Sequence, residues 1–159
     1  QGYMYKDLKQ PKVDATAEFC REINYDLQVE VVLDRFKRTT PVGNCVFVCV
    51  DEIDARKHIW DALKDKVNFL VDGRMSAEVL RVITACDDQS RKYYPQTLFA
   101  ASEAHAGRCT AKSTIYCANI AAGFMLAQFT KYLRLLPIDA DVQVNLLASE
   151  INVIDCMEA

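Results

Sequence analysis

Asp51 is the first residue whose type and position suggest chemistry. It follows six consecutive apolar residues, 45–50, which predict a strand buried on both faces, as in a parallel sheet covered by helices. In open α/β sheets, ligands bind at the carboxyl ends of the strands, so the Asp51 carboxylate is a candidate for binding a ligand. A carboxylate here could equally cap the helix that we expect over residues 54–64. Position alone leaves both roles open.

Cys109 is the candidate nucleophile. It lies in a long polar stretch between Arg108 and Lys112, and cationic neighbours lower the pKa of a thiol and so increase the fraction of reactive thiolate. His105, upstream in the same stretch, is a candidate general base. The alternatives are an exposed, unreactive cysteine and a surface histidine.

Arg74 belongs to a third candidate group. The tripeptide Asp-Gly-Arg at residues 72–74 follows a second, largely apolar run, residues 67–71, which predicts another buried strand. A glycine at a strand end lets the chain turn close to a ligand, and Arg74 would there meet an anion. The alternative is a turn held by an ion pair between Asp72 and Arg74.

The rest of the pattern predicts the elements that position these groups. Strands alternate with helices along the chain, which favours parallel pairing with right-handed crossovers. Residues 77–86 also fit helical spacing, but their Val, Ile and Thr content favours a strand. Residues 87–112 are polar and predict a long loop. We therefore expect an α/β fold with a mostly parallel, Rossmann-like sheet and flanking helices. The expected helices cover residues 11–23, 54–64 and 113–135, the last largely buried, and the expected strands cover residues 28–33, 45–50, 67–71, 77–86, 141–147 and 151–154.

The composition argues against several classes of partner. The 159 residues are sufficient for one domain with a core of its own. A net charge of -3 gives no electrostatic reason to expect binding to nucleic acid or to an anionic membrane. No apolar run approaches the roughly 20 residues that a membrane-spanning helix needs. The seven cysteines include no C-x-x-C pair, which favours a reducing, cytoplasmic location and no structural zinc.

Five short segments, in chain order, form a pattern of motifs. They are Gln-Pro-Lys-Val at residues 10–13, Ile-Asn at 23–24, Cys-Val-Asp-Glu-Ile-Asp-Ala-Arg at 49–56, Cys-Thr at 109–110 and Ala-Gln-Phe-Thr-Lys-Tyr-Leu at 127–133. They resemble the segments G-x-P-K-x-E, R-x-I-N-P, D-x-x-D-N-x-x-x-R, the Cys-Thr catalytic loop and the Q-A-x-E-A-I-K-x-L helix of the ThiF/MoeB superfamily. Members of that family adenylate ubiquitin-like proteins and sulfur carriers.

The resemblance implies a role for each candidate residue. Asp51 would bind Mg²⁺ together with ATP, and Lys12 would contact phosphate, although a solvated surface lysine is the alternative. Arg74 would meet either the nucleotide phosphates or the carrier's tail. Cys109 would attack the adenylate and form a thioester or acyl-disulfide link to the carrier. The implied partners are a small ubiquitin-like or sulfur-carrier protein and a second copy of the chain, as a homodimer.

The resemblance covers only the later part of the family's domain. No G-x-G-x-x-G phosphate-binding motif is present, and the five glycines are widely separated. We therefore expect residues 1–159 to form a single, incomplete ThiF-like adenylation domain that lacks the N-terminal glycine-loop unit. The alternative is a truncated or split module that is inactive alone and serves as a protein-binding or dimerisation partner. An oxidoreductase-type nucleotide domain is a third possibility, but no fingerprint supports it.

Overall fold

The first of two compact units holds a short helix that the sequence predicted correctly. The computed structural model describes residues 3–99 and 114–154. The chain divides into two compact units, unit 1 (Gln1–Lys37) and unit 2 (Arg38–Ala159). Unit 1 contains the 3₁₀ helix η1 (Tyr5–Asp7) and the α-helix α1 (Lys12–Ile23), which buries Ala15 and Ala17. Helix α1 confirms the helix expected over residues 11–23.

The strand expected over residues 28–33 is wrong, because these residues have no regular secondary structure. Their β-branched composition favours a strand only where a neighbouring strand and a packing surface are available. Here Val32 and Leu33 are exposed, and the Val29 carbonyl accepts a hydrogen bond from Arg21 of α1 at 3.0 Å. The segment is therefore held by a side chain and not by a strand ladder.

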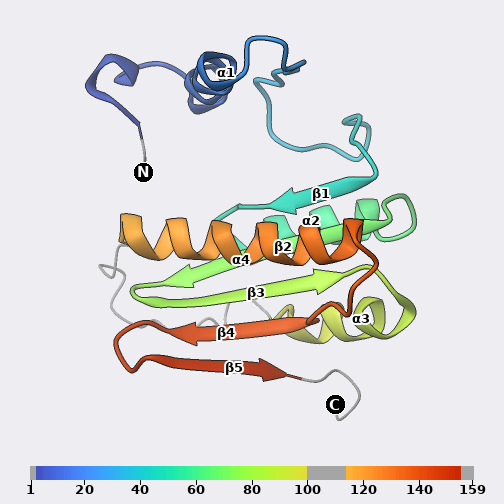
Figure 1. The fold of residues 1–159 in the computed structure, drawn as a ribbon. Coiled ribbons are helices and arrows are strands. Elements are labelled where there is room, and N and C mark those ends of the chain that lie inside the picture. Colours follow the sequence, from blue (N-terminus) through green and yellow to red (C-terminus); the bar gives the residue numbers. More distant parts are fainter. Residues whose placement is uncertain (1–2, 100–113, 155–159) are drawn as a thin grey trace. The chain divides into compact units, whose positions relative to one another are not determined.

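Unit 2 is an α/β structure built on one five-stranded sheet (Figure 1). The strands follow the spatial order β1-β2-β3-β4-β5, the same as their order in the sequence. This confirms the α/β class. The strands are β1 (Cys45–Val48), β2 (Phe69–Ser76), β3 (Val79–Ala85), β4 (Asp141–Asn145) and β5 (Glu150–Ile154), and the helices are α2 (Ile53–Leu63), α3 (Asp88–Tyr93), the 3₁₀ helix η2 (Tyr94–Thr97) and α4 (Ile115–Leu133).

The sheet is mostly antiparallel, so the expectation of a mostly parallel sheet was wrong. Strands β1 and β2 pair in parallel, with α2 as the crossover between them. The other three pairings are antiparallel. Ala77 and Glu78 alone connect β2 to β3, and residues 146–149 connect β4 to β5. Connections this short form hairpins, because a parallel crossover needs a dozen or more residues.

Three further local predictions were also wrong. Asp72, Gly73 and Arg74 lie inside β2 and do not form a turn after it. The expected loop over residues 87–112 begins with α3 and η2. Strand β1 is not buried on both faces, because Phe47 is 39% exposed.

The helices expected over residues 54–64 and 113–135 are confirmed as α2 and α4, and the last three expected strands as β3, β4 and β5.

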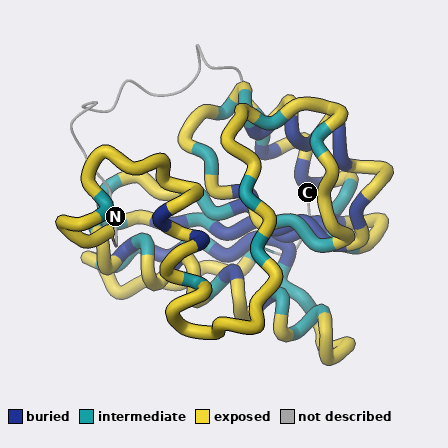
Figure 2. The backbone as a smooth tube through the Cα atoms, turned by 90° about the horizontal axis from the view of Figure 1, so that it is seen from above, coloured by how far each residue is buried: buried dark blue, intermediate teal, exposed yellow. Residues whose placement is uncertain are grey.

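The two faces of the sheet differ in chemistry because alternate residues of a strand point to opposite sides. One face packs against α4, which crosses it in Figure 1, and forms an apolar core. Figure 2 shows the buried positions concentrated along the strands. Helix α4 buries one side only, since Ile115, Ile120, Leu126 and Leu133 are exposed. The core comprises Phe69, Val71, Leu80, Val82, Val142 and Val144 of the sheet with Cys117, Ala121 and Met125 of α4.

The opposite face carries two fully buried carboxylates, Asp72 in β2 and Asp141 in β4. Helix α2 and the α3–η2 segment supply their partners, described below. The rings of Trp60 in α2 and Tyr94 in η2 lie 4.6 Å apart and join these two elements. Arg91 of α3 donates hydrogen bonds to the carbonyls of residues 64, 67 and 68. The ring contact and the hydrogen bonds of Arg91 therefore join the helical segments that cover this face of the sheet.

Gly73 permits the close approach of β2 and α4. A Cβ atom at this position would lie 2.6 Å from Sδ of Met125, so Gly73→Ala is expected to lower the free energy of unfolding by about 1–3 kcal/mol through overpacking. Urea denaturation measures this difference. In a Met125→Ala background the added methyl group has room, and the loss is expected to shrink. An equal loss in both backgrounds would contradict the close contact.

Candidate functional site

Asp51 lies between β1 and α2 and presents a carboxylate that no described residue binds. The N-cap position of α2 is occupied by Glu52, so Asp51 does not cap the helix. Among residues 3–99 and 114–154, none forms a hydrogen bond or ion pair with the exposed Asp51 side chain. Two pockets, each of about 350 Å³, share Asp51, Arg56 and Met75 in their walls. The carboxylate is therefore free to bind a ligand in either pocket.

The first of these, the apolar pocket, lies between the ends of β1 and β2 and the first half of α4. Its walls are formed mainly by small side chains. Besides the three shared residues, they comprise Cys49, Val50, Gly73, Ala118, Ala121, Ala122 and Met125.

The second, the arginine pocket, brings together two residues that the sequence singled out, Asp51 and Arg74. Arg56 and Arg81 also line it, so the described charged groups in its wall are three guanidinium groups and one carboxylate. Arg74 and Arg81 are direct cross-strand partners on β2 and β3. Each of the three arginines forms an ion pair with a buried carboxylate, Asp72 or Asp141, so most of this positive charge is offset within the protein. Ile53, Met75, Val79, Leu80 and Phe99 add apolar surface, and Ser76 completes the wall.

Asp72 lies behind this pocket, at the centre of a buried hydrogen-bonded cluster. Its Oδ1 accepts a hydrogen bond from Arg56 Nη1, and its Oδ2 accepts from Arg74 Nε at 2.8 Å and from Tyr94 OH at 2.9 Å. The remaining two nitrogens of Arg74 donate to the backbone oxygen and the hydroxyl of Thr97, at 2.7 and 3.0 Å. Burial, followed by the charge of Asp72, raises the pKa of Tyr94. Each guanidinium nitrogen of Arg74 therefore already has a partner.

A second cluster of the same kind surrounds Asp141. Arg81 Nε donates to both carboxylate oxygens at 3.0 Å, and Tyr93 OH donates to Oδ2 at 2.7 Å. Burial opposes the charge of Arg81, but its hydrogen bond to Asp141 and their attraction outweigh it, so the pKa of Arg81 is raised. The consecutive residues Tyr93 and Tyr94 thus each donate a hydrogen bond to one of the two buried carboxylates.

The other predicted site residues belong to unit 1 or lie outside the described residues. Lys12 is exposed at the start of α1 in unit 1 and lines a small pocket there with Asp7 and Lys9. Cys109 and His105 lie outside the described residues. The ion pair between Asp72 and Arg74, the alternative that the sequence offered, is present, but inside β2 and not in a turn. The pairing of Asp72 with Arg56 was missed. The available signal was a carboxylate directly after Leu70 and Val71, where an apolar residue would have been expected.

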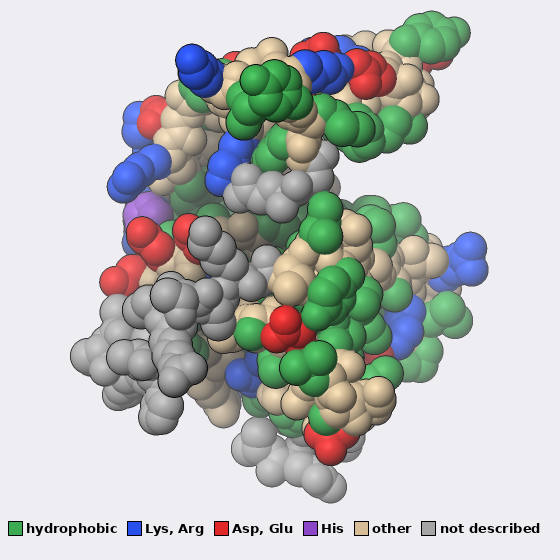
Figure 3. Space-filling view, turned by 90° about the vertical axis from the view of Figure 1, so that its left-hand side faces the viewer, with side chains coloured by type: hydrophobic (Ala, Val, Ile, Leu, Met, Phe, Trp, Pro, Cys, Tyr) green, Lys and Arg blue, Asp and Glu red, His purple; other side chains and the backbone are tan. Residues whose placement is uncertain are grey.

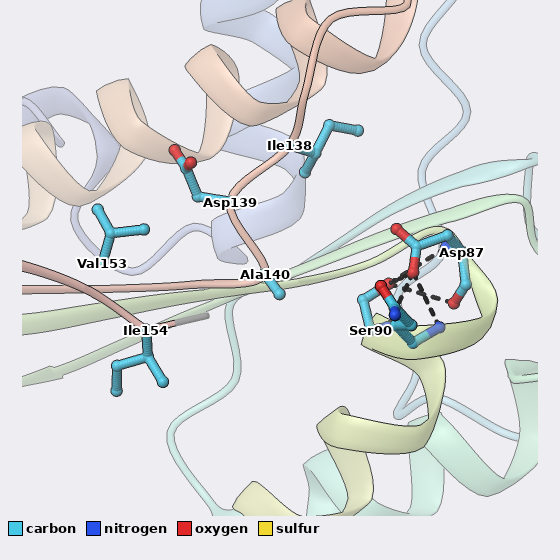
Figure 4. Close-up of a pocket in the computed structure, with 8 residues that line it drawn as sticks. Asp87, Ser90, Ile138, Asp139, Ala140, Val153 and Ile154 are labelled. Atoms are coloured by element: carbon cyan, nitrogen blue, oxygen red, sulfur yellow. Dashed lines mark hydrogen bonds between the residues drawn. The ribbon is translucent and has the colours of Figure 1, made fainter. Parts of the chain in front are cut away.

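A further pocket of about 270 Å³ contains two more carboxylates, and both already bind neighbouring groups. Figure 4 shows the Asp87 side chain turned toward Ser90. It accepts from the backbone nitrogens of Gln89 and Ser90 at 3.0 and 2.9 Å and so caps α3. Asp139 accepts from Lys131 at 2.6 Å. These carboxylates stabilise the fold, and we do not assign a ligand to them.

The cap predicts a pH-dependent effect of Asp87→Ala. At pH 7 the loss of the cap is expected to cost about 1 kcal/mol of unfolding free energy. Burial raises the pKa of Asp87, but hydrogen bonds from Ser90 and Gln89 outweigh it and lower the pKa below 3.8. The contribution is therefore present above pH 3.8 and is lost as the pH falls through the lower, folded-state value. Denaturation at pH 7 and in acid measures this, with Asp88→Ala as the control, and an equal difference at both pH values would contradict it.

One end of unit 2 exposes a group of apolar side chains. Figure 3 shows hydrophobic side chains gathered on this face, where the two hairpins turn. The first turn and α4 are joined there by a hydrogen bond from Tyr116 OH to Glu78, at 3.4 Å. Leu147, in the second turn, is 78% exposed. We call Met75, Val79, Ile115, Tyr116 and Leu147 the hairpin-end patch.

Comparisons with known proteins address the fold alone. No protein-family model and no curated protein matches this sequence significantly. The structure is similar to the crystal structure of the selenomethionine form of PaaA, with a TM-score of 0.71 and 16% sequence identity. The match covers 97% of this chain and 58% of the PaaA chain, so this chain spans less than two thirds of that protein.

Two searches of the described residues found no further site. No group of three or more His, Cys, Asp or Glu side chains there could hold a metal ion. In the same part of the chain, every helix is too short or too polar to cross a membrane.

Proposed function

We propose that this chain is a ThiF-like adenylyltransferase, which uses ATP and Mg²⁺ to activate the C-terminus of a small ubiquitin-like or sulfur-carrier protein. The observation that carries the proposal is the unpartnered Asp51 carboxylate at the carboxyl end of the parallel strand β1, beside a pocket that contains Arg74. The motif resemblance, which includes residues 49–56, supports the same assignment.

The chemistry explains why these residue types are needed together. In adenylation, a carboxylate oxygen attacks the α-phosphorus of ATP and pyrophosphate leaves. Both reactants are anions, so the site must supply positive charge and hold them in line. An exposed carboxylate without a protein partner suits Mg²⁺, which binds through one or two carboxylates and phosphate oxygens. Asp51 would hold that ion, and Arg74 would lie beside the anionic reactants, with its nitrogens bound to Asp72 and Thr97. A phosphate contact for Lys12 stays a prediction from the motif resemblance alone.

Calorimetric titration of Mg-ATP into the 159-residue chain tests the proposal. We expect saturable binding that requires Mg²⁺. Absence of binding, in a chain shown by circular dichroism to be folded, would contradict it.

Cys109 is proposed as the transfer nucleophile, and its removal should separate two steps. The thiolate would attack the adenylate carbonyl to form a thioester, releasing AMP. Burial, followed by the charge of Asp87, raises the pKa of Cys86 to about 11, so this thiol is a poor nucleophile at neutral pH. With Mg-ATP and a β-grasp carrier, Cys109→Ala should abolish a thiol-sensitive adduct and leave pyrophosphate release intact. An adduct that persists in this variant would identify a different nucleophile.

The second candidate function is partner binding by a module that is inactive alone. The exposed hairpin-end patch favours it, because apolar side chains exposed together at one end of a domain can form a protein interaction site. A homodimer and a cytoplasmic location belong to the proposal as well, the first from the resemblance and the second from the pattern of the seven cysteines. The Mg-ATP titration separates the two functions, since only the enzyme must bind the nucleotide.

A further inference from the structure

The buried carboxylate of Asp72 connects two parts of unit 2 that meet at the candidate site. It lies inside β2 with no exposed surface, and three donors share its two oxygens. Burying a charge costs several kcal/mol unless it is paired and hydrogen-bonded. This cluster therefore holds its members in one arrangement, because the loss of any donor leaves part of that cost without compensation.

Arg56 extends this arrangement to the end of β1. While its Nη1 binds Asp72, its Nη2 donates to the backbone oxygen of Val50, the residue before Asp51. The last paired residues of β1 and β2 are Val48 and Asp72, so Val50 lies beyond the strand ladder. The guanidinium group of Arg56 thus holds the backbone at Val50, where the hydrogen bonds between β1 and β2 have already ended.

We propose that Asp72 is a positioning residue that acts on Asp51 through Arg56. It orients the guanidinium group, which holds the Val50 carbonyl and thereby sets the direction of the exposed Asp51 carboxylate. This inference rests on the proposed function, in which Asp51 binds Mg-ATP. It also makes a separate structural statement, that removal of the Asp72 charge loosens residues 49–56.

Asp141 provides a matched control, which tests whether Asp72 does more than stabilise the fold. Both carboxylates are fully buried and lie on the same sheet face, and each accepts from a tyrosine and from arginine. The recorded partners of Asp141 are Arg81 and Tyr93, from β3 and α3, with none from β1 or α2 in the described chain. Asp141→Asn should therefore reproduce the loss of a buried charge without releasing the end of β1.

The experiment compares Asp72→Asn, Asp141→Asn and the unchanged chain in two measurements. The first is the Kd of Mg-ATP by calorimetry, which is expected to rise between about tenfold and a hundredfold in Asp72→Asn, because small misplacements of a binding group cost this much. The rise should be clearly smaller in Asp141→Asn, which releases Arg81 in the pocket wall but leaves the end of β1 in place. The second is hydrogen exchange by mass spectrometry, which is expected to be faster over residues 49–56 in Asp72→Asn than in Asp141→Asn. Urea denaturation of both variants provides the correction for global stability.

The outcomes separate the positioning role from the proposed function. Equal weakening by both variants, or weakening by neither, would overturn the positioning role. If the unchanged chain does not bind Mg-ATP, the proposed function fails, and hydrogen exchange alone decides whether Asp72 orders residues 49–56. If it binds but exchange over these residues is equal in the two variants, the positioning role fails and the function stands.

A second pair of variants covers the case in which Asp72→Asn does not fold. Arg56→Lys keeps the positive charge but cannot bridge Asp72 and the Val50 carbonyl with two separate nitrogens. Its control is Arg91→Lys, because Arg91 also bridges backbone carbonyls, at residues 64, 67 and 68, and lines neither pocket beside Asp51. The same expectation applies, with weaker Mg-ATP binding and faster exchange at residues 49–56 in Arg56→Lys alone, and equal behaviour of the two lysine variants would overturn the proposal.

Discussion

Asp51→Asn is expected to abolish magnesium-dependent binding of ATP while leaving the chain folded. The carboxylate is exposed and makes no hydrogen bond or ion pair with the residues that the structure describes, so the folded state loses no contact, and stability should change by less than about 0.5 kcal/mol. The amide keeps the shape but loses the charge that Mg²⁺ requires. Calorimetric titration with Mg-ATP measures the first effect, and urea denaturation measures the second.

Glu52→Gln is the matched control for this prediction. Glu52 is the adjacent exposed carboxylate, and its side chain makes no capping hydrogen bond to α2. Binding of Mg-ATP should survive in this variant. Unchanged binding in Asp51→Asn, or its loss in Glu52→Gln, would show that Asp51 is not the magnesium ligand.

Arg56→Met is expected to lower the free energy of unfolding by about 3 kcal/mol, the lower end of the cost of breaking a buried ion pair from one side, because Asp72 keeps its donors Arg74 and Tyr94. The side chain of Arg56 is 7% exposed and that of its partner Asp72 is fully buried, so water cannot replace the lost donor. The Val50 carbonyl loses its donor as well. Urea denaturation at neutral pH measures the change.

A double-mutant cycle with Asp72→Asn identifies the origin of this loss. Without the carboxylate charge there is no buried ion to leave unpaired, so Arg56→Met should cost clearly less in the Asp72→Asn background. Additive losses, or a single-variant loss below about 1 kcal/mol as measured for exposed pairs, would contradict a buried ion pair.

The helices were predictable because their signals are local. Apolar spacing and breakers indicated α1, α2 and α4 close to their observed bounds. The expected positions of β3, β4 and β5 were also correct, because β-branched content and alternation depend on each segment alone. Residues 28–33 have the β-branched composition of a strand but do not form one, since no neighbouring strand pairs with them.

Pairing direction and strand length were not predictable from the same signals. The tripeptide at residues 72–74 has turn composition, yet β2 continues through it because β3 pairs with it along its length, from Ser76↔Val79 back to Leu70↔Ala85. The hairpin turn is instead made at Ala77 and Glu78, where Ala77 adopts a positive φ of 52°. Alanine gives no sequence signal for this conformation, so the turn was placed too early and the sheet was expected to be parallel.

The sequence by itself determined helices α1, α2 and α4, most of the strands and the placement of Asp51 between the first strand of unit 2 and α2, because these follow from spacing and composition over a few residues. Only the tertiary structure decided that Asp51 is unpartnered, that Arg74 shares a pocket with it and that Asp72 holds Arg56. Arg56 and Asp72 are 16 residues apart. They meet because the parallel pairing of β1 and β2 places α2 over one face of the sheet, and no local pattern specifies which buried charges that packing brings together.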